Sequence, residues 1–190
     1  MSWMRWLGRS ESPDLERLME VLSSCHQSAA IGNENVSSVA VRLSASVDCP
    51  FQASVASAIL TLGDIHGPTA MTRWMLYSAE PDVLDQFIKT AHRVPGWGNS
   101  FHKAGIDPLF VPIAELIQEE YPDHYTNLGN VGDLIEKHRG KRLMPNAASF
   151  TAICSQILGM DEGTEISLVI AMRIPSWAAL WTEQKSELKQ

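Results

Sequence analysis

The residues best suited to chemistry include one histidine in a turn and one arginine after an apolar segment. His66 stands in the turn Gly63-Asp-Ile-His-Gly67, between two expected helices. An imidazole there can donate a hydrogen bond or move a proton, although it can equally cap a helix or fill a core. Arg173 follows the apolar segment 166–172. Burying a guanidinium without a partner is costly, so we expect a carboxylate beside it, from a ligand or from a structural Asp or Glu.

A loop rich in Gly and Pro, predicted at 94–108, carries further candidates. Trp97 is suited to a pocket wall. Asn99 can orient a substrate through its amide, although Asn is also a common turn residue. His102 is either a substitute acid or base or a surface histidine. Lys103 either meets a phosphate or stays solvated.

Composition bounds the class of protein. The chain has 190 residues, enough for one sizeable domain, with 45% hydrophobic and 19% charged residues; both shares are ordinary for a globular protein. The net charge of −7 argues against a nucleic-acid-binding protein, but it leaves room for a local basic pocket. No apolar run approaches the length that spans a bilayer.

The three cysteines are widely spaced and odd in number, at positions 25, 49 and 154. No CxxC pair or close ligand spacing suggests a metal site. We interpret them as reduced thiols and expect a cytoplasmic protein. The N-terminal segment MSWMRWLGR allows a membrane-surface helix, but a flexible or partner-packing tail is favoured because the segment is short.

The elements that must position these residues are helices broken by Pro and Gly. Ser12-Pro13 predicts a helix start, with Ser12 as N-cap, and Pro81 predicts another. Pro175 is expected to interrupt or kink the chain. The sequence therefore predicts an all-α fold, with a tail at 1–11, a single domain at 12–184 and a second tail at 185–190. Helical segments are predicted at 34–47, 50–62, after residue 68, at about 109–120, 128–138, 147–158, 166–172 and 177–184.

Segments in a fixed order give the chain a family resemblance. They are Asn35-Val-Ser-Ser38, the His66 turn, Pro95-Gly-Trp-Gly-Asn-Ser-Phe-His-Lys103 with Asp107-Pro108, Lys141-Arg-Leu-Met-Pro-Asn146, and Arg173-Ile-Pro-Ser-Trp177. Together they resemble the citrate synthase superfamily, including its short citryl-CoA lyase modules. The resemblance implies a multi-helix fold, truncated relative to a full citrate synthase. It also implies an obligate homodimer and a reaction that joins or cleaves a CoA thioester and a small di- or tricarboxylic acid.

The resemblance also assigns roles, and four positions depart from it. His66 matches the histidine that faces the thioester. The family's second histidine falls on Asn99, its catalytic aspartate on Ala148, and the arginine of its Asp-Pro-Arg motif on Leu109. A substrate-binding histidine falls near Gly32; His26 lies close in sequence, but the match does not place it there. Alanine can do no acid–base work.

Two functions remain open. The first is a citrate synthase-like acyltransferase or lyase that uses a CoA thioester as substrate, with no permanently bound cofactor and no metal. The second is a catalytically inert relative that binds CoA or a carboxylate for regulation or assembly. The expected site comprises His66 and Asn99 as catalytic residues, Arg173, Ser37 and His102 at the acid, and Lys103 and Trp97 at CoA.

Overall fold

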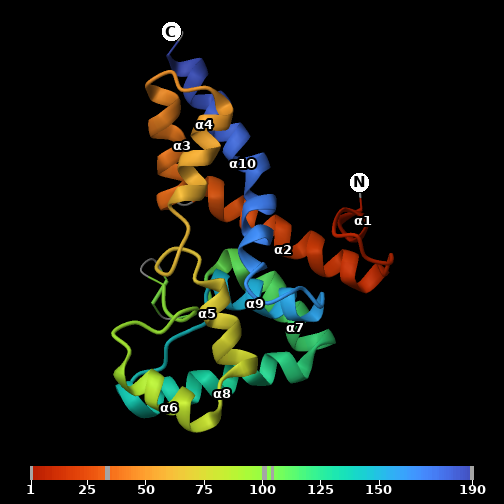
Figure 1. Ribbon diagram of the computed structural model, residues 1–190, viewed down its shortest axis with the longest axis vertical. Coiled ribbons are helices and arrows are strands. Elements are labelled where there is room, and N and C mark those ends of the chain that lie inside the picture. The colour runs from red at the N-terminus through yellow and green to blue at the C-terminus, as the bar shows by residue number, and fades with distance from the viewer. Residues whose placement is uncertain (1, 33–34, 100–101, 104, 189–190) are drawn as a thin grey trace.

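The computed structural model describes residues 2–32, 35–99, 102–103 and 105–188, and in this part of the chain it is all-α (Figure 1). The described residues form no strand, and only an isolated bridge joins Trp97 to Pro145. The prediction of an all-α fold is confirmed. The helices are α1 (Trp3–Trp6), α2 (Pro13–Gly32), α3 (Val36–Ser46), α4 (Phe51–Leu60), α5 (Thr69–Arg73), the π-helical turn η1 (Trp74–Ser78), α6 (Pro81–Thr90), the 3-10 turn η2 (Pro108–Phe110), α7 (Val111–Glu120), α8 (Pro122–Arg139), α9 (Ala147–Ile157) and α10 (Glu165–Glu187).

Proline and asparagine set many helix starts. α2 and α6 begin at Pro13 and Pro81 as predicted, because proline suits the first turn, where its missing N–H is not needed. α8 begins at Pro122, ahead of the predicted start at residue 128. Asn35 and Asn146 cap α3 and α9 by accepting hydrogen bonds from backbone N–H groups in the first turn.

Pro175 does not interrupt the chain. α10 runs without a break from Glu165 to Glu187, so of the two predicted outcomes the interruption is wrong. The Pro175 side chain is exposed. On an exposed face, water can bond the carbonyl that the missing proline N–H leaves free.

The helices form a body and a projection (Figure 1). α3, α4 and the C-terminal part of α10 lie together at one end of the long axis, and α5 to α9 form the other end. α2 crosses between them. The main core fills the body. A small second core fills the projection and is made of Val41, Ala58, Trp177 and Leu180.

The packed part of the chain begins ahead of the predicted boundary at residue 12. α1 lies against α2, and Met4 is buried in the main core. The carboxylate of Glu16 accepts hydrogen bonds from the backbone N–H groups of Trp3 and Met4 at 2.6 and 3.0 Å. Residues 3–6, within the segment expected as a tail at 1–11, thus pack against the domain. At the other end α10 runs past the predicted boundary at residue 184.

A buried ion pair ties α5 to α10. Arg73 donates from its Nη1 to Glu165 at 2.8 Å, and Glu165 has no exposed surface. Arg73 also bonds Gln156 and the carbonyl of Met160. These contacts fix the helix that follows the His66 turn against the helix that carries Arg173. Among the described helices, none combines the length and apolarity needed to cross a bilayer.

Candidate functional site

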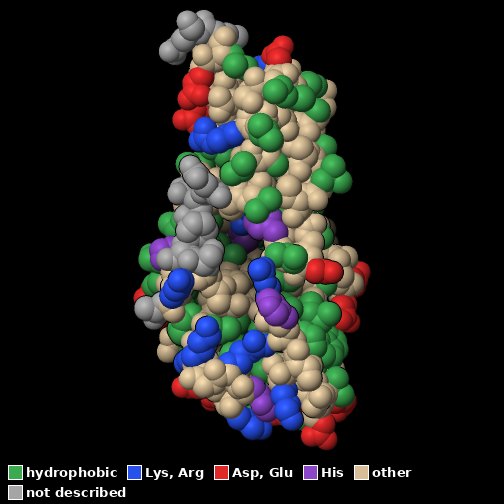
Figure 2. Space-filling view, turned by 90° about the vertical axis from the view of Figure 1, so that its left-hand side faces the viewer, with side chains coloured by type: hydrophobic (Ala, Val, Ile, Leu, Met, Phe, Trp, Pro, Cys, Tyr) green, Lys and Arg blue, Asp and Glu red, His purple; other side chains and the backbone are tan. Residues whose placement is uncertain are grey.

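A cavity of about 600 Å³ opens where the projection meets the body. Figure 2 shows it as a hollow partway along the long axis, with histidine at its edge and Lys and Arg side chains below it. Its walls come from α2, the turn at 62–69, the loop at 92–99, the start of α9 and the middle of α10. Segments far apart in sequence therefore converge on one space.

The His66 turn is held by its own backbone. The N–H of Gly63 donates to the carbonyl of His66 at 2.9 Å. Gly67 has φ of +91°, a conformation that glycine adopts without strain. The turn places the His66 side chain at the cavity, with Nε2 3.4 Å from the hydroxyl oxygen of Ser37.

Arg173 is the buried cation of the cavity. Its side chain is 6% exposed, and Nη1 donates to Ser37 Oγ at 3.1 Å. No carboxylate of the described residues lies within ion-pair distance of its guanidinium, and Nε has no hydrogen-bond partner there. Burial lowers the pKa of Arg173 to about 10, so the side chain stays charged at neutral pH. Of the two carboxylates expected beside Arg173, the one from a structural Asp or Glu is absent from the described part of the chain.

Ser37 joins the two sequence-predicted groups. Its hydroxyl lies between His66 and Arg173 and donates to Asn35 Oδ1 at 2.7 Å. Ser37 is fully buried. It therefore positions its neighbours from behind the cavity wall.

Two neutral imidazoles lie beside Arg173. Burial, with a smaller contribution from the charge of Arg173, lowers the pKa of His66 to about 4. The same two causes, in the same order, hold the pKa of His26 well below its usual range. His26 lies on α2, is 1% exposed and lines the cavity. Sequence reasoning did not assign it to the site.

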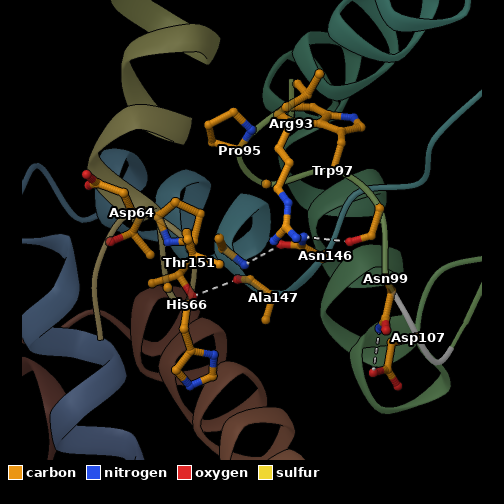
Figure 3. Close-up of a pocket in the computed structure, with 18 of the residues that line it drawn as sticks. Asp64, His66, Arg93, Pro95, Trp97, Asn99, Asp107, Asn146, Ala147 and Thr151 are labelled. Carbon is orange, nitrogen blue, oxygen red and sulfur yellow. Dashed lines mark hydrogen bonds between the residues drawn. The ribbon is translucent and has the colours of Figure 1, made fainter. Parts of the chain in front are cut away.

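The loop at 92–99 is tied to the start of α9 (Figure 3). Asn146 N–H donates to the carbonyl of Gly96 at 2.8 Å, and its side-chain amide donates to that of Gly98 at 2.9 Å. Asn99 lines the cavity and donates to Asp107 Oδ2 at 3.2 Å. Trp97 is a buried part of the cavity wall.

The sequence model of the family described as citrate synthase, C-terminal domain, matches residues 2–190. The chain belongs to this family.

Solved structures of a citryl-CoA lyase, a citrate synthase and an ATP citrate lyase share the fold. Citryl-CoA lyase from Hydrogenobacter thermophilus matches with a TM-score of 0.79 and 21% identity, over 96% of this chain and 74% of that one. Citrate synthase from Thermotoga maritima matches with a TM-score of 0.71 and 20% identity, over 95% of this chain and 51% of that one. An ATP citrate lyase from Methanosaeta concilii in complex with (3S)-citryl-CoA matches with a TM-score of 0.75 and 14% identity, over 95% of this chain and 33% of that one. No curated protein sequence matches the chain.

The position that the resemblance to citrate synthase assigns to the catalytic aspartate lies at the cavity. Ala148 lines it and is buried. Two carboxylates also line the cavity, Asp64 and Asp107. Both oxygens of Asp107 accept hydrogen bonds, from Leu109 N–H and from Asn99. Asp64 is exposed and lies at the edge of the labelled group in Figure 3. Ala148 thus brings no base to the cavity.

The remaining predicted residues lie outside the cavity wall. His102 Nε2 is 3.6 Å from Asp107 Oδ1. Lys103 is exposed. Neither is among the residues that line the cavity, whereas Arg93, Arg139 and Lys141 are. These three cations give the cavity a basic margin that sequence reasoning did not assign. The described residues contain no group of His, Cys, Asp and Glu that could hold a metal ion.

Proposed function

We propose that this protein is a citrate synthase-like acyl-CoA transferase or a lyase of the citryl-CoA type, acting on a CoA thioester and a small di- or tricarboxylic acid. One observation carries the proposal: Arg173 is buried at the cavity without a carboxylate partner in the described part of the chain. A buried charge of this kind is stable only when paired. A ligand carboxylate supplies the missing partner.

The two imidazoles support an anionic ligand. Because His66 and His26 are neutral near pH 7, they add no positive charge that would repel Arg173. A neutral imidazole still has one N–H to donate. Ser37 donates its hydroxyl hydrogen to Asn35, so His66 Nε2–H donates to Ser37 in a long contact of 3.4 Å. We propose that a thioester oxygen replaces Ser37 as the acceptor, so that this N–H stabilises the charge that develops there.

The basic margin supports a CoA thioester. Arg93 and Lys141 are exposed and line the cavity. Phosphate groups bind such side chains by charge-assisted hydrogen bonds. We assign the phosphates of CoA to this margin. Lys103, further along the same loop, and Trp97 remain proposed CoA contacts.

Ala148 favours a second function, a catalytically inert relative that binds CoA or a carboxylate. A buried methyl group at the base position cannot remove the proton next to the thioester. Losing a general base typically slows a reaction by roughly two to four orders of magnitude. The fold, Arg173 and the basic margin would be kept by a binder as well as by an enzyme.

One experiment separates the two functions. Acetyl-CoA is titrated into the protein by calorimetry, alone and with oxaloacetate, while free thiol is measured. Thiol release that disappears in His66→Ala supports the enzyme. Saturable binding without thiol release supports the inert binder and contradicts the enzyme.

A substitution of Arg173 tests whether this residue binds the carboxylate of the ligand. Arg173→Met removes the charge but keeps much of the side-chain length. We expect it to weaken oxaloacetate binding by at least about tenfold, because the ligand carboxylate loses its charged partner. Arg142→Met is the matched control, since Arg142 is exposed, pairs with Asp133 and lies outside this cavity. Equal affinity of both variants for oxaloacetate would contradict the role of Arg173. Failure of the wild-type protein to bind CoA or acid would contradict both proposed functions.

We also propose that the protein is a homodimer. α3 and its C-cap residue expose an apolar row at helical spacing on the projection: Val36, Val39 and Leu43 in the helix and Val47 at the C-cap. Exposed apolar surface of this kind is typical of an interface between proteins. The expected homodimer of the family supplies the second copy.

A further inference from the structure

Unpaired buried polar atoms gather on residues of the cavity. In the described part of the chain, seven buried side-chain nitrogen or oxygen atoms have no hydrogen-bond partner, and four of these belong to cavity residues. Such atoms are uncommon in native proteins and mark places where a ligand or water completes the structure. The four are His26 Nδ1, Trp97 Nε1, Arg139 Nε and Arg173 Nε.

The neighbours of His26 determine which of its nitrogens carries the proton. Thr151 Oγ1 lies 2.8 Å from the carbonyl oxygen of Ala147 and 2.8 Å from His26 Nε2. A carbonyl oxygen only accepts, so the single hydroxyl hydrogen of Thr151 must lie toward Ala147. His26 Nε2–H therefore donates to Thr151. In the neutral imidazole, Nδ1 is left as a bare acceptor.

An acceptor and a donor are thus both unsatisfied at the same cavity. His26 Nδ1 lacks a donor, and Arg173 Nε lacks an acceptor. Both side chains line this cavity, His26 from α2 and Arg173 from α10. A ligand with a carboxylate next to a hydroxyl satisfies both groups at once.

We propose that His26 Nδ1 accepts a hydrogen bond from a hydroxyl of the acid held at Arg173, so that the site selects hydroxy acids. The inference rests on the proposed function, because it assumes that Arg173 holds a ligand carboxylate. A keto oxygen offers lone pairs and no hydrogen, so it faces His26 Nδ1 without a bond. A deoxy analogue leaves Nδ1 unpaired as it is in the free protein.

The test compares acids that differ only in the hydroxyl group. Citrate and tricarballylate form one such pair, and malate and succinate form another; oxaloacetate adds the keto counterpart of malate. Each acid is titrated into the wild-type protein by calorimetry with CoA present. We expect citrate to bind at least about tenfold more tightly than tricarballylate, since one net hydrogen bond to a buried acceptor is worth about that factor. Malate should likewise bind more tightly than succinate and more tightly than oxaloacetate.

Two variants of similar shape isolate the acceptor. His26→Leu and His26→Asn both lose the hydrogen bond to Thr151, but only Asn keeps an oxygen close to the position of Nδ1. We expect His26→Leu to bind citrate and tricarballylate within about twofold of each other, and His26→Asn to regain part of the preference. Circular dichroism and thermal melting establish that both variants are folded.

The outcomes separate this inference from the proposed function. Equal binding of citrate and tricarballylate by wild type would overturn the role of His26 and leave the carboxylate site at Arg173 intact. A preference that survives in His26→Leu, or that does not return in His26→Asn, would overturn the acceptor role as well. No binding of any acid or of CoA would overturn the proposed function itself.

Discussion

The fixed charge of Arg173 and the burial of its neighbours set the electrostatics of the cavity. Arg173 keeps its proton at neutral pH although burial lowers its pKa to about 10. Burial, with a smaller contribution from the charge of Arg173, lowers the pKa of His66 and of His26 as well, so both imidazoles are neutral at this pH. At the buried part of the cavity, inside the basic margin, the result is one positive charge flanked by neutral hydrogen-bonding groups, an arrangement suited to an anion.

The lowered pKa of His66 predicts how stability depends on pH. In the unfolded chain His66 takes up a proton near pH 6.5, whereas in the folded protein it does so near pH 4. Between these values the unfolded state binds more protons, so the free energy of unfolding must fall as pH decreases from about 6.5 to about 4. We expect a shallower fall in His66→Gln, measured by urea denaturation at each pH.

His92→Gln is the control for this measurement. His92 is exposed at the edge of the same cavity. It should keep the wild-type slope. An unchanged slope in His66→Gln would mean that His66 does not supply this part of the pH dependence.

Motifs in the sequence named several of the residues that line the candidate cavity, and the omission of His26 has a physical cause. His66, Trp97, Asn99 and Arg173 all line one cavity as their motifs suggested. His26 was missed because motif matching looks for the same position in the chain. The signal that could have found it is periodicity: His26 lies one helical turn after Leu22, on the buried face of α2.

At the scale of elements, the loop at 92–99 depends on close backbone packing. Gly96 has φ of +80°, and a Cβ atom there would lie 2.5 Å from Thr72 Cγ2 and 2.7 Å from Ser149 Oγ. Gly98 has φ of +85°, but its Cβ would meet only Leu143, at 3.8 Å. Because both glycines share the same backbone cost, comparing them isolates the clash.

We expect Gly96→Ala to destabilise the protein more than Gly98→Ala does. The positive φ costs each variant about 1–2 kcal/mol, and the overlap in Gly96→Ala adds roughly 1–3 kcal/mol. Thermal and urea denaturation of the two variants give the difference directly. Equal losses of stability would show that Thr72 and Ser149 move aside freely.

Local signals predicted helix starts better than helix continuity. Proline at the first helical position marked α2 and α6 correctly. The first turns of α8 are rich in polar residues and lack an apolar period, so the start at Pro122 escaped notice. Continuity of α10 through Pro175 depends on which side of the helix faces solvent, and that is fixed by tertiary packing. The π-helical turn η1 has no recognisable local pattern.

At the scale of the whole molecule, the apolar row on α3 predicts self-association. Leu43 is 65% exposed near the middle of this row. Leu43→Glu places a charge on the proposed interface, and burying an unpaired charge is costly. We expect wild type to be a dimer and Leu43→Glu to be a monomer by light scattering after gel filtration.

Val83→Glu is the matched control for Leu43→Glu. Val83 is a similarly exposed aliphatic residue on α6, at the other end of the molecule (Figure 1). It should leave the dimer intact. A wild-type monomer, or dissociation by both variants alike, would contradict the α3 interface.

The small core of the projection has a consequence for hydrogen exchange. Four buried side chains hold α3, α4 and the end of α10 together, whereas α9 is buried along most of its length in the body. Amide protons of α3 and α4 should therefore exchange through local opening, and those of α9 only through global unfolding. A second copy bound to α3 would slow the exchange of amide protons in α3 and α4 and leave exchange in α9 unchanged. The exchange pattern of the projection therefore reports on assembly.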